Sequence, residues 1–136
     1  MSNEWSEADD VARIPLQLAR SCVVASIQID LTLPVLRRFR ADLLEFLRET
    51  GARAVILDLS GLMIMDIDEF DAVRETMAMV RLMGAESVIA GMQPGVISSL
   101  IDLDAEVDGI SAAFNLDGAF DLVENLVEMS MRVQEE

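Results

Sequence analysis

The sequence predicts an α/β domain with a mixed β-sheet of four to five strands and about four α-helices. Short runs of β-branched and aliphatic residues alternate with longer segments in which apolar residues recur at helical spacing. The first two runs follow each other closely, whereas each later pair is separated by a helical segment. This order is typical of a hairpin that is followed by parallel strands.

The first expected elements are a β-hairpin and a helix. Residues 14–18 and 22–29 have the composition of two antiparallel strands, joined by three residues. Thr32 can cap the next helix, Pro34 fits its first turn, and Gly51 can end it. Apolar residues face one side of this helix. The opposite side, which we expect to be solvated, carries Arg37, Arg38, Arg40 and Arg48.

The middle of the chain predicts a buried strand that leads into a second helix. Residues 54–59 are almost continuously apolar, which favours a strand in the interior of the sheet. The run ends in Ser60 and Gly61, and Asp66 is the natural N-cap of the helix that follows. The predicted core stripe of this helix consists of Phe70, Val73, Met77 and Val80.

The remaining segments continue the alternation of strand and helix. Residues 87–90 read as a strand, and Pro94 can start a short helix through residue 103. Residues 111–114 predict a brief edge strand. We expect Asp117 to cap the last helix, which continues to about Val133.

The last helix carries apolar residues on two sides. One stripe, predicted to face the core, contains Phe120, Val123, Val127 and Met131. The second stripe contains Leu122, Leu126, Met129 and Val133. Two stripes indicate either a helix wedged between other elements or a helix that meets another chain. We expect the second stripe to mediate homo-oligomerisation.

Length and charge limit the classes of function. With 136 residues, the chain predicts an acidic, mobile N-terminal tail over residues 1–12 and a single domain over residues 13–133. The formal net charge is −15, and all ten basic residues are arginines. This balance argues against nucleic acid and anionic membrane as partners, because both require a basic surface. No apolar run is long enough for a membrane span, and the acidic N-terminus is unlike a signal peptide, so we expect a cytoplasmic protein.

The residue types offer little support for catalysis. The chain contains no His, Lys or Tyr, and Cys22 lies in an apolar run without a base to activate it. No glycine-rich phosphate-binding motif occurs. Two acidic groups are more typical of a solvated surface than of a metal site: Asp66, Asp68 and Glu69, and Asp102, Asp104, Glu106 and Asp108. The sequence therefore predicts a protein that is not an enzyme and that needs no cofactor or metal.

Several short segments, in their order and spacing, resemble the STAS domain family of anti-sigma-factor antagonists, and within it the small stressosome scaffold proteins of the RsbS type. The resemblance extends from about Ile14 to Val123. It rests on Ile14-Pro15-Leu16, Ala25-Ser26-Ile27-Gln28, Glu49-Thr50-Gly51-Ala52, Ile56-Leu57-Asp58-Leu59-Ser60, Arg81-Leu82-Met83-Gly84-Ala85 and Gly91-Met92-Gln93-Pro94.

The resemblance implies the STAS fold and a regulatory scaffold without enzymatic activity in stress signalling. Its partners would be a switch-type Ser/Thr kinase and sensor proteins that carry the same domain. In the family, the kinase phosphorylates a Ser or Thr that usually follows an Asp, and this chain has Ile67 after Asp66. The implied partner-binding residues are Asp66, Ile67, Asp68, Glu69, Ser60, Met92 and Gln93.

Isoleucine at this position leaves two interpretations of the site. The chain either stays in the kinase-binding state because the release step is lost, or Asp68 and Glu69 supply part of the charge of a phosphate. We favour the first, because the two carboxylates are displaced in register from Ile67. Two other functions stay open: a small-molecule sensor with a pocket near residues 91–94 and Ile67, and a STAS subunit of a membrane-transport system.

Overall fold

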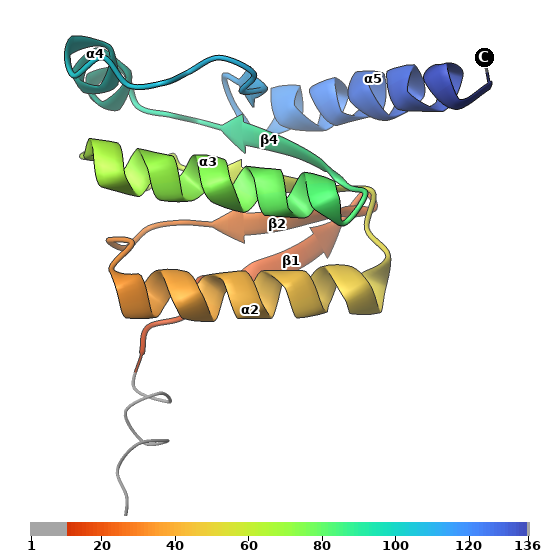
Figure 1. The fold of residues 1–136 in the computed structure, drawn as a ribbon, viewed down its shortest axis with the longest axis horizontal. Coiled ribbons are helices and arrows are strands. Elements are labelled where there is room, and N and C mark those ends of the chain that lie inside the picture. The colour runs from red at the N-terminus through yellow and green to blue at the C-terminus, as the bar shows by residue number, and fades with distance from the viewer. Residues whose placement is uncertain (1–10, 136) are drawn as a thin grey trace, which may run out of the picture.

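A five-stranded mixed sheet forms the middle layer of the molecule (Figure 1). The computed structural model describes residues 11–135, so most of the predicted N-terminal tail lies outside the described residues. The strands follow one another in chain order, and only the first pair is antiparallel. They are β1 (Leu16–Ala19), β2 (Cys22–Ser26), β3 (Ala54–Asp58), β4 (Glu86–Ala90) and β5 (Ala112–Ala113).

Helices cover both faces of the sheet. They are α2 (Leu33–Thr50), α3 (Ile67–Leu82), α4 (Pro94–Asp102) and α5 (Leu116–Glu135). Figure 1 shows α2 and α3 side by side over one face, and α5 packs over β3, β4 and β5 from the other. The predicted α/β fold class is confirmed. None of the helices in the described part of the chain combines the length and apolar character needed to cross a membrane.

Two hydrophobic cores sandwich the sheet. Along β3, Val55 and Leu57 belong to the core under α2 and α3, whereas Ala54 and Ile56 belong to the core under α5. All four side chains are fully buried. Residues alternate between the two faces of a strand, so a strand that is covered on both faces must be apolar throughout. Half-buried Val11 packs against the first core.

The hairpin has a two-residue turn. Arg20 and Ser21 both have positive φ, 51° and 62°, and this left-handed pair matches the natural twist of two antiparallel strands. Both strands are shorter than the sequence predicted. The Arg20 guanidinium lies 4.8 Å from the ring centre of Phe120 on α5, so a cation–π contact links the turn to the opposite layer.

Helix caps account for most of the predicted boundaries. Thr32 accepts a hydrogen bond from the Val35 amide, and Gly51 ends α2 in the left-handed region, as expected. The predicted N-cap of α5 is wrong. Asn115 caps this helix by accepting a bond of 2.8 Å from the Gly118 amide, and Asp117 lies within its first turn.

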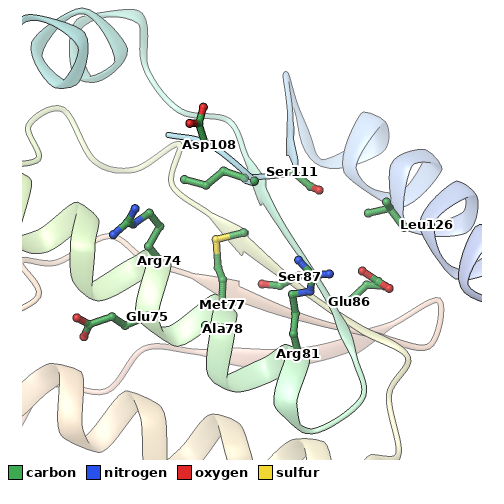
Figure 2. A pocket seen from close by; sticks show the side chains of 12 residues that line it. Arg74, Glu75, Met77, Ala78, Arg81, Glu86, Ser87, Asp108, Ser111 and Leu126 are labelled. Carbon is green, nitrogen blue, oxygen red and sulfur yellow. The ribbon is translucent and has the colours of Figure 1, made fainter. Parts of the chain in front are cut away.

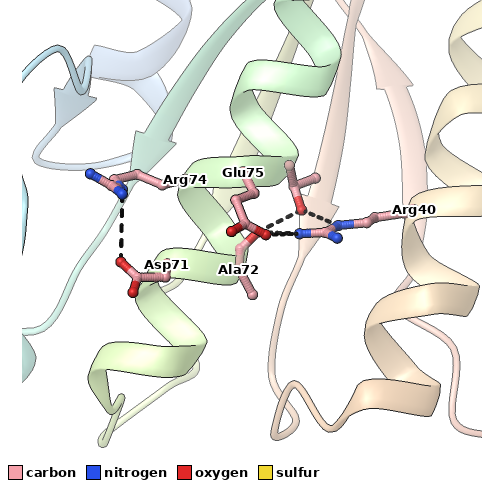
Figure 3. Close-up of polar contacts among 6 residues, drawn as sticks. Arg40, Asp71, Ala72, Arg74 and Glu75 are labelled. Atoms are coloured by element: carbon pink, nitrogen blue, oxygen red, sulfur yellow. Dashed lines mark hydrogen bonds and ion pairs between the residues drawn. The ribbon is translucent and has the colours of Figure 1, made fainter.

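Arg40 is not solvated, contrary to the expectation for the polar side of α2. Its Nε donates to Thr76 Oγ1 over 2.9 Å, and its Nη2 donates to the Ala72 carbonyl over 2.9 Å (Figure 3). Glu75 completes the contact with an ion pair of 3.4 Å. Thr76 is almost fully buried, and Arg40 therefore supplies a polar link between α2 and α3.

The burial of side chains on α5 depends more on their position along the helix than on the side of the helix that carries them. Phe120 and Val123 are buried in the core beneath α5, and residues of both predicted stripes, Leu122, Leu126 and Val127, are half-buried against it. Residues 128–133 are all exposed, so Met131 does not belong to a core stripe as predicted. A helix of 20 residues is about 30 Å long, whereas a five-residue strand covers about 17 Å.

Candidate functional site

The parallel strands β2, β3 and β4 end at the same edge of the sheet, at the left of Figure 1. Each strand end continues into a loop. The backbone pairing extends past the strands: the Ile27 amide donates to the Asp58 carbonyl over 3.0 Å, and the Leu59 amide donates to the Ala90 carbonyl over 2.9 Å. These bonds place the three loops next to one another, and they form what we call the carboxyl edge.

The loop between β3 and α3 lies flush against the loop that follows β4. Asp58 Oδ1 accepts a bond of 3.0 Å from the Ser60 amide, and Gln93 Nε2 donates to the Ser60 carbonyl over 2.8 Å. Gly91 has a φ of 72°, and a Cβ atom there would lie 3.0 Å from Ser60 Cβ and 3.3 Å from Asp58 Oδ1. Only glycine fits this conformation and this separation without strain.

The other flank of the same loop is equally close to its neighbour. A Cβ atom on Gly61 would lie 2.6 Å from Cγ of Gln28, which belongs to the loop after β2. The loop between β3 and α3 is therefore held from both sides. Gln28 is not among the site residues predicted from the sequence, because only the fold brings it to this edge.

The middle of this loop presents two large apolar side chains to solvent. Met63 is 73% exposed and Ile64 is 80% exposed, while their neighbours Leu62 and Met65 are buried in the core. The buried pair anchors the loop, and the exposed pair projects from it. Exposed apolar neighbours of this size are typical of a contact surface. In the sequence, this pair is indicated only by two apolar residues between a strand and a helix cap, and it is not among the predicted site residues.

A capping box closes the start of α3. Asp66 Oδ1 accepts from the Glu69 amide over 2.7 Å, and Glu69 Oε1 accepts from the Asp66 amide over 3.4 Å. Glu69 Oε2 also accepts a bond of 3.3 Å from the Leu31 amide, which fixes the loop after β2. Carboxylates thus already occupy the helix start, and the arrangement does not favour an additional anion there.

The remaining side chains of the first turn face outward to different degrees. Ile67 is half-buried and Asp68 is exposed. Both Glu69 oxygens serve the loop structure, and Asp68 is therefore the carboxylate of this turn that stays available. The carboxyl edge presents an apolar surface with acidic neighbours and contains no nucleophile activated by a base.

The structure brings the predicted partner-binding residues together and places the predicted oligomerisation residues elsewhere. The partner-binding residues gather at the carboxyl edge, although Met92 is half-buried against the core and Gln93 binds the Ser60 carbonyl. The set predicted for oligomerisation lies on α5, across the sheet. Among residues 11–135, no three His, Cys, Asp or Glu side chains come close enough to hold a metal ion.

Comparison with known proteins identifies the family. The family model of the STAS domain matches residues 13–121. The chain belongs to the STAS domain family. Among curated proteins the comparison finds no match.

Solved structures share the fold of this STAS domain. A serine-to-glutamate variant of RsbS from Moorella thermoacetica superimposes with a TM-score of 0.72 at 23% identity, covering 86% of this chain and 99% of that one. A chain from a study of the molecular architecture of the stressosome gives 0.72 and 23%, covering 83% and 98%. A Thermotoga maritima protein described as an anti-sigma factor antagonist gives 0.64 and 15%, covering 82% and 94%. At these identities the likeness shows the fold alone.

This STAS domain also has a polar pocket away from the carboxyl edge (Figure 2). It has a volume of about 350 Å³ and lies between α3, β4 and the segment before β5. Arg74, Arg81 and Ser87 line it together with the acidic residues Glu86 and Asp108. Ser87 is 4% exposed, and its Oγ has no hydrogen-bond partner among the described residues.

Proposed function

We propose that this STAS domain is a regulatory scaffold or antagonist that works by binding other proteins and catalyses no reaction. Its partners are a switch-type Ser/Thr kinase and sensor proteins that carry a STAS domain, in a cytoplasmic assembly of the stressosome kind. The observation that carries the proposal is the carboxyl edge: a loop clamped on both sides that presents Met63 and Ile64 to solvent, next to the half-buried Ile67 at the start of α3.

The rigidity of the loop supports a binding role. A surface that is already fixed before a partner arrives loses little conformational entropy when the partner binds. The clamps at Gly61 and Gly91, together with the second bond of Glu69, provide this fixed geometry. Apolar side chains at its centre and Asp68 at its side give the surface both contact area and charge.

The position of Ile67 supports loss of phosphorylation control. Isoleucine has no hydroxyl group and accepts no phosphate. Thr76, the hydroxyl residue on α3, is 1% exposed and bonded to Arg40, so a kinase cannot reach it. Ser60 is exposed at the carboxyl edge and is the alternative acceptor. Because Glu69 is engaged within the loop, only Asp68 is left to imitate a phosphate charge.

The test uses a switch-type Ser/Thr kinase encoded by the same organism. The wild-type chain is expected to bind the kinase and to take up no phosphate after incubation with ATP, measured by calorimetry and mass spectrometry. Ile67→Ser is expected to accept phosphate, because its hydroxyl would lie in the first turn of α3 at a position that is partly exposed. The phosphate adds up to about two negative charges beside Asp68, so the phosphorylated variant is expected to bind more weakly.

Matched variants separate the outcomes. Ile67→Ala removes the same apolar contact without adding a hydroxyl, and it is expected to bind without phosphorylation. Phosphate on Ser60 of the wild-type chain would show that control has moved within the carboxyl edge. If neither the wild type nor Ile67→Ser binds the kinase, the kinase part of the proposal is wrong.

Self-association and co-assembly belong to the same proposal. The exposed end of α5 carries Met129 and Val133, which are 61% and 72% exposed. Leu122 and Leu126, predicted to act with them, are half-buried and contribute only their outer surfaces. We therefore assign the contact between copies to the last two turns of α5.

The polar pocket favours a second candidate function, a small-molecule sensor. Its site differs from the predicted one, because it lies beside β5 and not at residues 91–94. The buried and unpartnered Ser87 hydroxyl is a group that a polar ligand would satisfy. A thermal-shift screen of small polar metabolites tests this function, since a ligand that binds only the folded chain raises its melting temperature. Loss of the shift in Ser87→Ala would locate the ligand in this pocket.

A further inference from the structure

A second hollow, which we call the α4–β5 groove, is apolar. Its volume is about 430 Å³, and its walls come from α4, β5 and the segment between them. Ile97, Ile101, Val107 and Phe114 line the groove and are exposed. Phe114 is 93% exposed and Ile101 is 66% exposed, although side chains of this size are usually covered in a single domain.

Exposed acidic side chains lie on the segment that forms one wall of the groove. The segment that joins α4 to β5 alternates apolar residues with exposed acids, and these acids are Asp102, Asp104, Glu106 and Asp108. The excess of negative charge extends beyond this segment, because residues 82–131 contain no arginine, lysine or histidine. Arg74 reaches the segment from α3, but its Nη1 is bonded to the Glu106 carbonyl and its Nη2 pairs with Asp71.

The charge of the groove decides which occupant fits. In a symmetric contact of two copies through this groove, Asp102 and Asp104 would face the same acids of the other copy, and the repulsion would oppose the contact. An acidic membrane surface is disfavoured for the same reason. A basic segment with apolar anchors gains from both features, because its cations neutralise the rim while its apolar side chains fill the groove.

We propose that the α4–β5 groove docks a basic amphipathic segment of a partner protein. Large apolar side chains of that segment enter between α4 and β5 and cover Ile101 and Phe114. Its lysines or arginines pair with Asp102 and Asp104 at the rim. The groove adjoins the carboxyl edge, because Met92 lines it, but this contact does not require the kinase contact.

The probe is a synthetic amphipathic peptide of leucine and lysine, about 14 residues long so that it can form a helix. Its binding to the ¹⁵N-labelled full chain is followed by NMR. We expect the amide shifts to concentrate at Ile101, Val107 and Phe114 and affinity to fall as salt is added. A peptide with glutamate in place of lysine is expected not to bind. A peptide of the same composition without amphipathic order is expected to bind weakly.

Variants distinguish the groove from general attraction to an acidic surface. Phe114→Ser and Ile101→Ser remove exposed side chains, so the fold is retained, and each is expected to weaken peptide binding about tenfold. Leu82→Ser removes a comparably exposed apolar side chain at the end of α3 and is expected to change affinity by less than about twofold. Asp104→Asn tests the contribution of the negative charge at the rim. Asp104 has a φ of 59°, and asparagine keeps this left-handed conformation while the charge is removed.

Three outcomes would overturn the proposal. The first is a set of shifts spread evenly over the acidic surface, and the second is equal binding by the Phe114→Ser and wild-type chains. The third is a concentration-dependent shift at Ile101 and Phe114 without peptide, which would assign the groove to a second copy of the chain.

Discussion

The Arg40 guanidinium on α2 donates a hydrogen bond of 2.9 Å to the buried hydroxyl of Thr76 on α3. The Thr76 hydroxyl in turn donates to the Ala72 carbonyl over 2.7 Å, and that carbonyl also accepts from Arg40. The three groups form a closed polar unit between two helices (Figure 3).

Removing the arginine from this unit should destabilise the domain. Arg40→Ala leaves the Thr76 oxygen buried without its donor, and we expect a loss of about 1–3 kcal/mol in the free energy of unfolding. Urea unfolding measures the change. Arg48→Ala is the matched control, because Arg48 forms an exposed pair with Glu45 on the same helix, and its loss is expected to stay within about 0.5 kcal/mol. Equal effects of the two variants would contradict the structural role of Arg40.

Glycine at position 91 should be required at the carboxyl edge. Gly91→Ala would place a methyl group 3.0 Å from Ser60 Cβ at a φ of 72°, and we expect a loss of about 1–3 kcal/mol, which lowers the melting temperature by several degrees. Gly95→Ala, in the first turn of α4, meets nothing within 4 Å and is the control. It is expected to be neutral or slightly stabilising. A Gly91→Ala chain that melts at the wild-type temperature would refute the close contact between the loops.

Cys22 should control how stability depends on alkaline pH. Burial raises the pKa of its thiol above the ordinary value, and the Arg53 guanidinium beside it offsets only part of the rise. The unfolded thiol loses its proton first, near pH 8.5, so the unfolded state then binds fewer protons than the folded state. Stability is therefore complete below about pH 8.5 and falls above it, by at most about 1.4 kcal/mol per pH unit, until the folded thiol ionises.

The composition makes this measurement clean. The chain has no Lys, Tyr or His, so no other side chain titrates between about pH 7 and 11. Chemical unfolding of the wild type and of Cys22→Ala across this range gives the slopes. The N-terminal amine contributes equally to both chains. We expect the variant to lose most of the decline, and parallel slopes would contradict a raised pKa.

Self-association should depend on the free end of α5. We expect light scattering at micromolar concentration to give a mass above that of one chain, and Met129→Glu to lower this mass by placing a charge in an apolar contact. Leu82→Glu, at a more exposed apolar position on α3, should leave the mass unchanged. Leu126→Glu is unsuitable for the test, because Leu126 packs against the core and its loss would disturb the fold. A single-chain mass at every concentration would remove the support for contact through α5.

Features that depend on neighbouring residues were predictable from the sequence. Thr32, Gly51 and Asp66 mark helix ends by their own backbone chemistry, and all three act as expected. The turn at Arg20 and Ser21 follows from the short separation between two strands. The positions of Asp66 and Ile67 at one edge also follow, because a helix that succeeds a parallel strand must start beside the strand's carboxyl end.

Features that depend on the packed fold were not predictable in this way. Asn115 and Asp117 are both good caps, and Asn115 prevails because Leu116 packs against the second core as part of the helix. Arg40 looks solvated on a helical wheel, since the wheel does not show α3. The exposure of Met131 follows from the length of the sheet under α5. Glu69 was expected to meet a partner, and its bond to Leu31 joins residues 38 positions apart.

The carboxyl edge and the free end of α5 point to opposite ends of the molecule (Figure 1). A partner bound at one end of the chain would not obstruct a partner bound at the other end. On the proposed contacts, a chain that meets a second copy through α5 would keep its carboxyl edge free for another partner. On the proposed contacts, a change at Ile67 would alter binding at the carboxyl edge and leave the contact through α5 intact.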